Sequence, residues 1–168
     1  MNCYLAGPID QVSDHGSGWR NEVKEYFKDN KNILFFDPVA PYSFGSINRG
    51  MSDYIVKVNI EAMNHADLIV VRMMKDQVSI GTPTEMYHSL AVKKPMIICT
   101  DIESVYMTFF MARALEVVCN TEQLCTAVLN AEIQIRVAKD KAQASEEMKK
   151  KMDVFKVFGD ELCRAQNH

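Results

Sequence analysis

The chain has 168 residues, of which 48% are hydrophobic and 24% charged, and its formal net charge at pH 7 is −3. This length and composition are typical of one globular domain that buries a core without disulfides or metal ions. The small negative charge argues against broad electrostatic binding to nucleic acid or to an anionic membrane.

The five cysteines are scattered, with no C-x-x-C pair and no Cys/His cluster of zinc-like spacing. Several lie in apolar runs, which predicts buried free thiols and a reducing cytoplasm. The four histidines share no ligand spacing with carboxylates, so we expect neither a metal nor another cofactor. The start, "MNCYLAGPID", has no basic region and no long apolar run, so we expect no signal peptide and no anchor.

Short apolar runs alternate with segments of helical periodicity along the chain. Strands are predicted near 3–7, 32–36, 67–73 and 95–100, with 115–120 as a candidate fifth. Helices are predicted over 18–30, 54–66, 84–92 and 104–115, and again from Thr121, which is the expected N-cap. This alternation favours an α/β domain with a parallel sheet, and runs such as "LIVV" suit strands that are covered on both faces.

Ligands of parallel sheets bind beyond the carboxyl ends of the strands. We therefore expect one cleft to be formed by the loop after Gly7-Pro8, the loop 37–53 and the loop 74–84. The charge-rich segment 131–168 differs from the domain 1–130 and is predicted to be a helical extension. It would pack as an amphipathic helix on the domain or on a dimer partner.

Glu85 follows a Gly-Thr-Pro-Thr turn and is expected at the head of a short helix. A carboxylate at a helix N-terminus can be a capping residue, because the first N–H groups and the helix dipole favour negative charge. It can also be a nucleophile at the mouth of the sheet. The residue pattern leaves both interpretations open.

Three motifs together resemble the nucleoside 2-deoxyribosyltransferase family, which includes the 2'-deoxynucleoside 5'-monophosphate N-hydrolases. They are "YLAGPID" (4–10), "NHADLIVV" (64–71) and "GTPTEMYHSLAVKKP" (81–95), and the resemblance spans about residues 2–115. It implies a Rossmann-like, flavodoxin-like fold. It also implies an enzyme that acts on nucleosides or nucleotides, in a homodimer or larger assembly whose active sites are completed across an interface.

The resemblance assigns the catalytic roles. Glu85 matches the family's nucleophile, which attacks the anomeric carbon and forms a glycosyl ester that water or a second base resolves. Tyr4 matches the tyrosine whose hydroxyl orients that nucleophile, whereas a tyrosine in a strand is by itself more often a core residue. We expect the helix N-terminus to keep Glu85 ionised.

Six residues before the nucleophile, the transferases carry an aspartate and the hydrolases a serine that binds the 5'-phosphate. This chain has Ser79, and a hydroxyl followed by Gly81 and Thr82 offers neutral donors and exposed N–H groups that suit a phosphate better than a general acid. An ordinary turn serine is the alternative. Asp76 lies nearby and could replace the missing carboxylate.

The chain also departs from its relatives. Pro8 stands where the hydrolases have a further phosphate-binding serine, and Asn59 stands where relatives carry an aspartate that contacts substrate. An amide can donate and accept hydrogen bonds but cannot act as a base. Tyr87 replaces a usual glycine and is expected to narrow or reshape the pocket.

Other candidate ligands come from two segments. In "DHGSGWR" (14–20), His15, Trp19 and Arg20 could stack on a base or pair with phosphate, although packing or solvation is an equal alternative for Trp19 and Arg20. Thr108 falls near the place from which a neighbouring subunit reaches the phosphate in the hydrolases.

The leading hypothesis is an N-glycosidase of a (deoxy)nucleoside 5'-monophosphate, with substrate-binding groups at Gly7, Arg20, Asn59, Ser79, Gly81 and Thr108. A nucleoside 2-deoxyribosyltransferase is the first alternative and a non-catalytic nucleotide-binding module the second. Besides the small-molecule substrate and a second copy of the chain, no partner is expected.

Overall fold

The computed structural model describes residues 1–9, 12–40, 49–77 and 79–165. Its strands are β1 (Asn2–Ala6), β2 (Leu34–Phe36), β3 (Leu68–Arg72), β4 (Met96–Cys99) and β5 (Glu116–Val118). Its helices are α1 (Ser17–Tyr26), α2 (Arg49–His65), α3 (Gly81–Ala91), α4 (Val105–Met111) and α5 (Thr121–Ala165). Every strand pair is parallel, so the predicted α/β fold with a parallel sheet and a helical C-terminal segment is confirmed.

The strand order is β2-β1-β3-β4-β5. After β1 the chain adds β2 on one side of β1 and then crosses to add β3 on its other side. In the β1–β3 pair, Tyr4 lies opposite Ile69 and Ala6 lies opposite Val71. The connections diverge between β1 and β3, which opens a crevice at the carboxyl ends of these two strands. The order and this switch point match the flavodoxin-like arrangement that the motifs imply.

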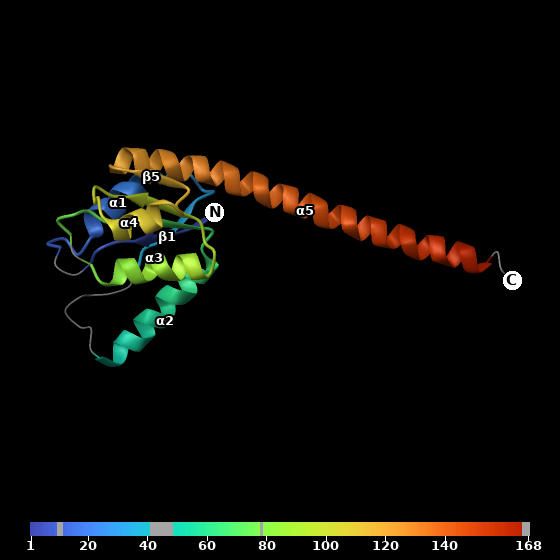
Figure 1. Ribbon diagram of the computed structural model, residues 1–168, viewed down its shortest axis with the longest axis horizontal. Coiled ribbons are helices and arrows are strands. Elements are labelled where there is room, and N and C mark those ends of the chain that lie inside the picture. The colour runs from blue at the N-terminus through green and yellow to red at the C-terminus, as the bar shows by residue number, and fades with distance from the viewer. Residues whose placement is uncertain (10–11, 41–48, 78, 166–168) are drawn as a thin grey trace. The chain divides into compact units, whose positions relative to one another are not determined.

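Alternate residues of the central strands point to opposite faces of the sheet. One face carries Tyr4 and Ala6, which pack in a buried cluster with Met63 of α2, Met86 of α3 and Met107 of α4. Figure 1 shows α1 and the first turns of α5 on the other side of the sheet from α2 and α3. The core therefore lies in two layers, and Tyr4 belongs to the layer under α2 and α3.

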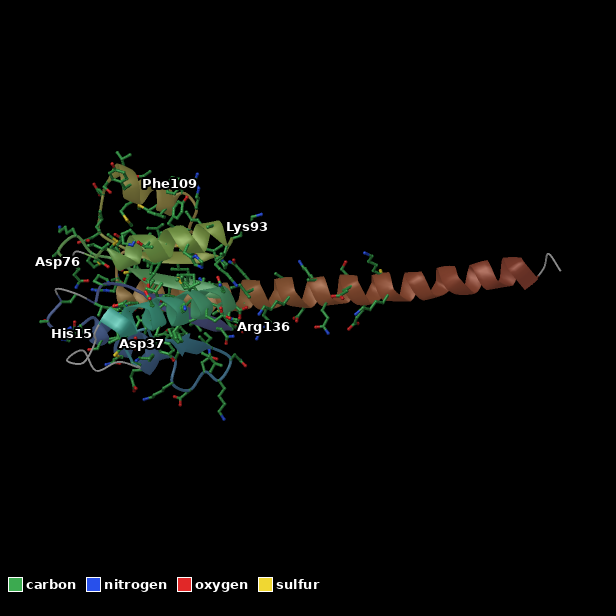
Figure 2. The ribbon with its side chains drawn as sticks, turned by 90° about the horizontal axis from the view of Figure 1, so that it is seen from below. His15, Asp37, Asp76, Lys93, Phe109 and Arg136 are labelled. Carbon is green, nitrogen blue, oxygen red and sulfur yellow. The ribbon has the colours of Figure 1, made fainter. Side chains whose placement is uncertain are left out.

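The loops after the first three strands gather at one end of the domain. Figure 2 shows His15, Asp37 and Asp76, which follow β1, β2 and β3, at the same end, while Lys93, which precedes β4, lies at the opposite end. This is the arrangement that the sequence predicts for the binding cleft. Residues 41–48 of the predicted loop 37–53 lie outside the described residues.

Three helix starts differ from the sequence prediction. α2 begins at Arg49, inside the predicted loop, and α3 begins at Gly81, three residues early. Ser79 explains the second shift because its Oγ accepts a hydrogen bond from the Thr82 N–H at 3.1 Å, and a proline at position 83 is tolerated in a first turn. At α5 the capping residue is Asn120 rather than Thr121, since Asn120 Oδ1 accepts from the Gln123 N–H at 2.9 Å.

The chain divides into two compact units, Met1–Glu132 and Ile133–His168. The second unit continues α5 and consists mainly of charged and exposed side chains as far as they are described. Its packing on the domain or on a partner stays a prediction. None of the described helices combines the length and the apolar character that crossing a bilayer needs.

Candidate active site

A pocket of about 280 Å³ is lined by residues of α2 and α3, and Figure 1 shows the two helices meeting at the C-terminal end of α2 and diverging toward its N-terminal end. Both helices line it with residues spaced three and four apart, which is one face of each helix. The polar lining side chains come from Asn59 on α2 and from Thr84, Glu85 and His88 on α3. The full lining is Val56, Asn59, Ile60, Met63, Ile80, Gly81, Thr84, Glu85 and His88.

Tyr4 and Glu85, 81 positions apart in the chain, meet beneath this pocket. The Tyr4 hydroxyl donates a hydrogen bond of 2.6 Å to Glu85 Oε1. The Tyr4 side chain is fully buried, and its ring stacks on Phe36 with 5.5 Å between centroids. A buried core ring therefore holds its hydroxyl against the carboxylate, and the orienting role of Tyr4 stays a prediction.

The capping interpretation of Glu85 is wrong. Glu85 is in the second turn of α3, no acidic residue occupies the first turn, and Ser79 supplies the cap. The expectation that the helix N-terminus keeps Glu85 ionised also needs correction. Burial raises its pKa to about 6, against the lowering effects of the Tyr4 hydrogen bond and the Arg20 charge. With this pKa the carboxyl group is still largely ionised at pH 7, and burial rather than the helix N-terminus has the largest influence on its titration.

Arg20 occupies a different place from the one expected of a substrate ligand. Its side chain is fully buried, and its three guanidinium nitrogens donate to the carbonyl oxygens of Leu5, Gly7, Pro8 and Gly16. Burial lowers its pKa, whereas nearby carboxylates, first Asp37 and then Glu85, raise it. Arg20 thus ties the loop after β1 to α1, and direct contact with a substrate would require these bonds to break.

Sequence reasoning missed Asp37, the partner of that arginine. Asp37 Oδ1 lies 3.5 Å from Arg20 Nε and accepts from the Val39 N–H, while Oδ2 accepts from Lys24 Nζ at 2.7 Å. Its position directly after a predicted strand was the available signal. The Arg20–Asp37 ion pair therefore links the carboxyl ends of β1 and β2.

Gly7 is a packing position. A Cβ there would lie 2.8 Å from Trp19 Cζ2 and 3.0 Å from the Arg72 carbonyl oxygen, so a larger residue would displace the indole or the backbone. Trp19 is buried, with the Arg20 guanidinium 4.7 Å from its ring centroid, which matches the packing alternative for both residues. His15 is exposed and has φ 51° in the turn before α1.

Ser79 and Gly81 stand at the start of α3, and only Gly81 lines the pocket. Ser79 Oγ is 2.8 Å from Thr82 Oγ1 in addition to its capping bond, and Gly81 lines the pocket with open space where a Cβ would stand. Ser79 itself does not line the pocket. Asp76 is exposed in the loop after β3. A phosphate role of Ser79 therefore stays a prediction, and capping is the role that the geometry displays.

Asn59 and His88 are the remaining polar groups of the lining. Asn59 Oδ1 is buried and has no hydrogen-bond partner among the described residues. A buried acceptor without a partner costs free energy, so it is a candidate for a ligand's donor. His88, which sequence reasoning did not select, bonds through Nε2 to Asn64 Oδ1 at 3.0 Å.

Thr108 and Tyr87 lie outside this lining. Thr108 is exposed on α4, and its Oγ1 donates to the Ser104 carbonyl at 2.9 Å. Its predicted role concerns a neighbouring subunit and stays a prediction. Tyr87 is 66% exposed, so it does not narrow the pocket as expected. Within the described residues, no group of three or more His, Cys, Asp or Glu side chains is placed to hold a metal ion.

The comparisons with known proteins agree with these motifs. The family model described as "Nucleoside 2-deoxyribosyltransferase like" matches residues 1–102. The 2-deoxyribosyltransferase of Bacillus psychrosaccharolyticus superposes with a TM-score of 0.60 at 16% identity, over 74% of this chain and 90% of that chain. A conserved protein of Enterococcus faecalis V583 superposes with a TM-score of 0.59 at 16% identity, over 75% and 95%. At these identities the structural likeness shows the fold. No curated protein gives a significant match.

Proposed function

The chain belongs to the nucleoside 2-deoxyribosyltransferase-like family, whose enzymes act on the base–sugar bond of nucleosides, and on that premise we propose that it hydrolyses this bond in a (deoxy)nucleoside 5'-monophosphate. Glu85 is the nucleophile in this proposal and Tyr4 is its orienting residue.

The observation that carries the proposal is the bond between the Tyr4 hydroxyl and Glu85 at the floor of the α2–α3 pocket. A carboxylate that only stabilised the helix would gain nothing from a second-turn position or from a buried tyrosine. The pocket walls, Val56, Ile60 and Met63, are apolar and suit the flat face of a base or a sugar.

The chemistry has two steps. Glu85 Oε attacks the anomeric carbon as the bond to the base nitrogen breaks, and the electron pair leaves with the base, which takes a proton from solvent. Water then forms a new bond to the anomeric carbon and gives up one proton, which reaches the solvent, while the ester bond to Glu85 breaks with its electron pair returning to the carboxylate. Negative charge beside the anomeric carbon stabilises the oxocarbenium-like transition state of both steps.

Phosphate recognition is assigned to the start of α3. The Ser79 hydroxyl and the first N–H groups of α3 next to Gly81 are neutral donors, and α3 carries no acidic residue in its first turn. The helix dipole adds a favourable field for an anion there. Asn59, being neutral, adds no negative charge to the pocket that would repel a phosphate.

A transferase remains the second candidate because Pro8 stands where the related hydrolases have a phosphate-binding serine. The two activities share Glu85 and differ in whether water or a second base resolves the glycosyl ester. We also propose the homodimer that the family implies and a reducing compartment, since Cys3, Cys99 and Cys125 are buried free thiols.

The test is incubation of the purified protein with nucleosides and with their 5'-monophosphates, with and without an acceptor base, while chromatography follows the released base. Release from monophosphates alone would support the hydrolase. Release only from free nucleosides with an acceptor would make the protein a transferase. No release, together with a rise of the melting temperature when nucleotide is added, would make it a binding module.

A further inference from the structure

The second step of the proposed reaction needs a group that takes a proton from the attacking water. Glu85 cannot serve, because it is the leaving group of that step. Asn59, Thr84 and Gly81 offer no basic side chain. Among the described residues that line the pocket, His88 is the remaining one with a basic side chain.

His88 lies three residues after Glu85 on the same face of α3. Side chains at this spacing have Cβ atoms about 5–6 Å apart. A helical side chain also leans toward the N-terminal turn, which is the side of His88 on which Glu85 lies, while Nε2 of the ring contacts Asn64 of α2. The spacing therefore places His88 beside Glu85 on the pocket-lining face of α3.

Asn64 determines which imidazole nitrogen can act. Asn64 Oδ1 is an acceptor and lies 3.0 Å from His88 Nε2, so Nε2 carries the proton and donates. In the neutral ring Nδ1 then holds a free lone pair. In this form Nδ1 can accept a proton while the Nε2–H bond stays with Asn64 Oδ1, which fits the water-activating step rather than protonation of the departing base.

We propose that His88 is the general base of the second step and that Asn64 of α2 holds its ring in the active tautomer. This inference rests on the proposed glycosidase function. His88 Nδ1 takes a proton from water as the water oxygen bonds to the anomeric carbon, and the ester bond to Glu85 breaks. The imidazolium then releases its proton to solvent through its exposed edge.

The test uses the full-length protein with His88→Gln, because this change keeps the polar character of a partly exposed position. The substrate is the monophosphate that the wild type cleaves best. We expect a first burst of released base equal to the enzyme concentration, followed by steady-state turnover about 100-fold or more below wild type. Intact-mass spectrometry should show the sugar-phosphate adduct, mapped to Glu85 by peptide analysis.

Azide provides a second readout, since this anion attacks without losing a proton. It should restore turnover of His88→Gln and yield the glycosyl azide while changing wild-type turnover little. His65→Gln is the matched control, because His65 is an exposed histidine at the end of α2 outside this pocket. It should behave as the wild type. Asn64→Ala should slow the same step by about tenfold.

The outcomes separate this inference from the proposed function. A wild type that releases base, with a His88→Gln variant that turns over equally fast, would overturn the role of His88 alone. If His88→Gln lost the burst of released base as well as the steady-state rate, the first step would be affected and the role of His88 in water activation would be overturned. The same conclusion would follow if azide did not raise the turnover of His88→Gln. A wild type that releases no base would overturn both.

Discussion

Two polar regions lie close to Tyr4, and they differ in how completely their groups are paired. The Arg20 cluster, which consists of Arg20, Asp37, Lys24 and the carbonyls after β1, has partners at every guanidinium nitrogen. The α2–α3 pocket holds a carboxylate with a raised pKa and an acceptor, Asn59 Oδ1, without a partner among the described residues.

This difference separates structural from functional use of polar residues. A buried charge whose hydrogen bonds are all made holds chain segments together, and its removal leaves several acceptors unpaired. A buried group that stays unpaired or poorly solvated costs stability, and such groups persist where a ligand uses them. Sequence pattern alone suggested substrate contact for Arg20 and Asn59 alike, and the pairing of their atoms distinguishes them.

The largest expected effect is on activity, at Glu85. Glu85→Gln removes the nucleophile, so base release should fall by about 10³-fold or more in the chromatographic assay. The same change should raise the free energy of unfolding by about 2 kcal/mol at pH 8, because the ionised carboxylate is buried there.

The sign of the stability effect depends on pH. The folded-state pKa of about 6 lies above the unfolded value, so the wild-type protein gains stability as pH falls through 6 and the advantage of the variant shrinks. Urea unfolding at pH 8 and at pH 5 measures both values. Equal free energies of unfolding of the wild type and Glu85→Gln at pH 8 would contradict the raised pKa of Glu85.

The next effect is on stability, at Arg20. Arg20→Met leaves the carbonyls of the β1 loop and the Asp37 carboxylate without their donor, which should cost about 3–5 kcal/mol in urea unfolding. Lys24→Met is the matched control on the same carboxylate. Lys24 is 35% exposed, so its loss should cost about 1 kcal/mol or less. Similar costs for both variants would remove the distinction between the two regions.

Tyr4→Phe should have an intermediate effect. Loss of a hydrogen bond to a charged group removes about 1.5–3 kcal/mol, which corresponds to a fall of about 10–100-fold in base release at pH 7. The Tyr4 hydroxyl lowers the pKa of Glu85, and attack requires the ionised form, so the acid limb of the pH–rate profile should move above pH 6. An unmoved limb with a reduced rate would show that Tyr4 orients the carboxylate without stabilising its charge.

The smallest effect is expected at Asn59. Asn59→Leu replaces a buried acceptor that has no partner within the described part of the chain with an apolar side chain, so the free energy of unfolding should rise by about 1 kcal/mol or stay unchanged. The value of kcat/KM should fall by about tenfold if a substrate donor uses Oδ1. A stability loss above about 1 kcal/mol would indicate that the amide already has a partner in the free protein.

Local patterns predicted most elements because their signals lie within a few residues. The apolar runs around Tyr4-Leu5 and "LIVV" form β1 and β3 as predicted. The segment 54–66, predicted as a helix from its apolar spacing, lies almost entirely within α2. The helix starts were predicted less well. At α3, a serine cap before a Gly-Thr-Pro turn moved the start to Gly81, so Glu85 fell in the second turn.

The sequence by itself determined the α/β alternation, the loops that follow the strands, and the family of the chain, whose motifs contain Tyr4 and Glu85. These follow from periodicity, turn residues and motif spacing, which are local properties. Only the tertiary structure decided that Arg20 turns inward to the β1 loop and that Asn59 and His88 share a pocket with Glu85. Those relations depend on strand order and helix packing between distant segments, and on the desolvation that packing produces, which no local pattern contains.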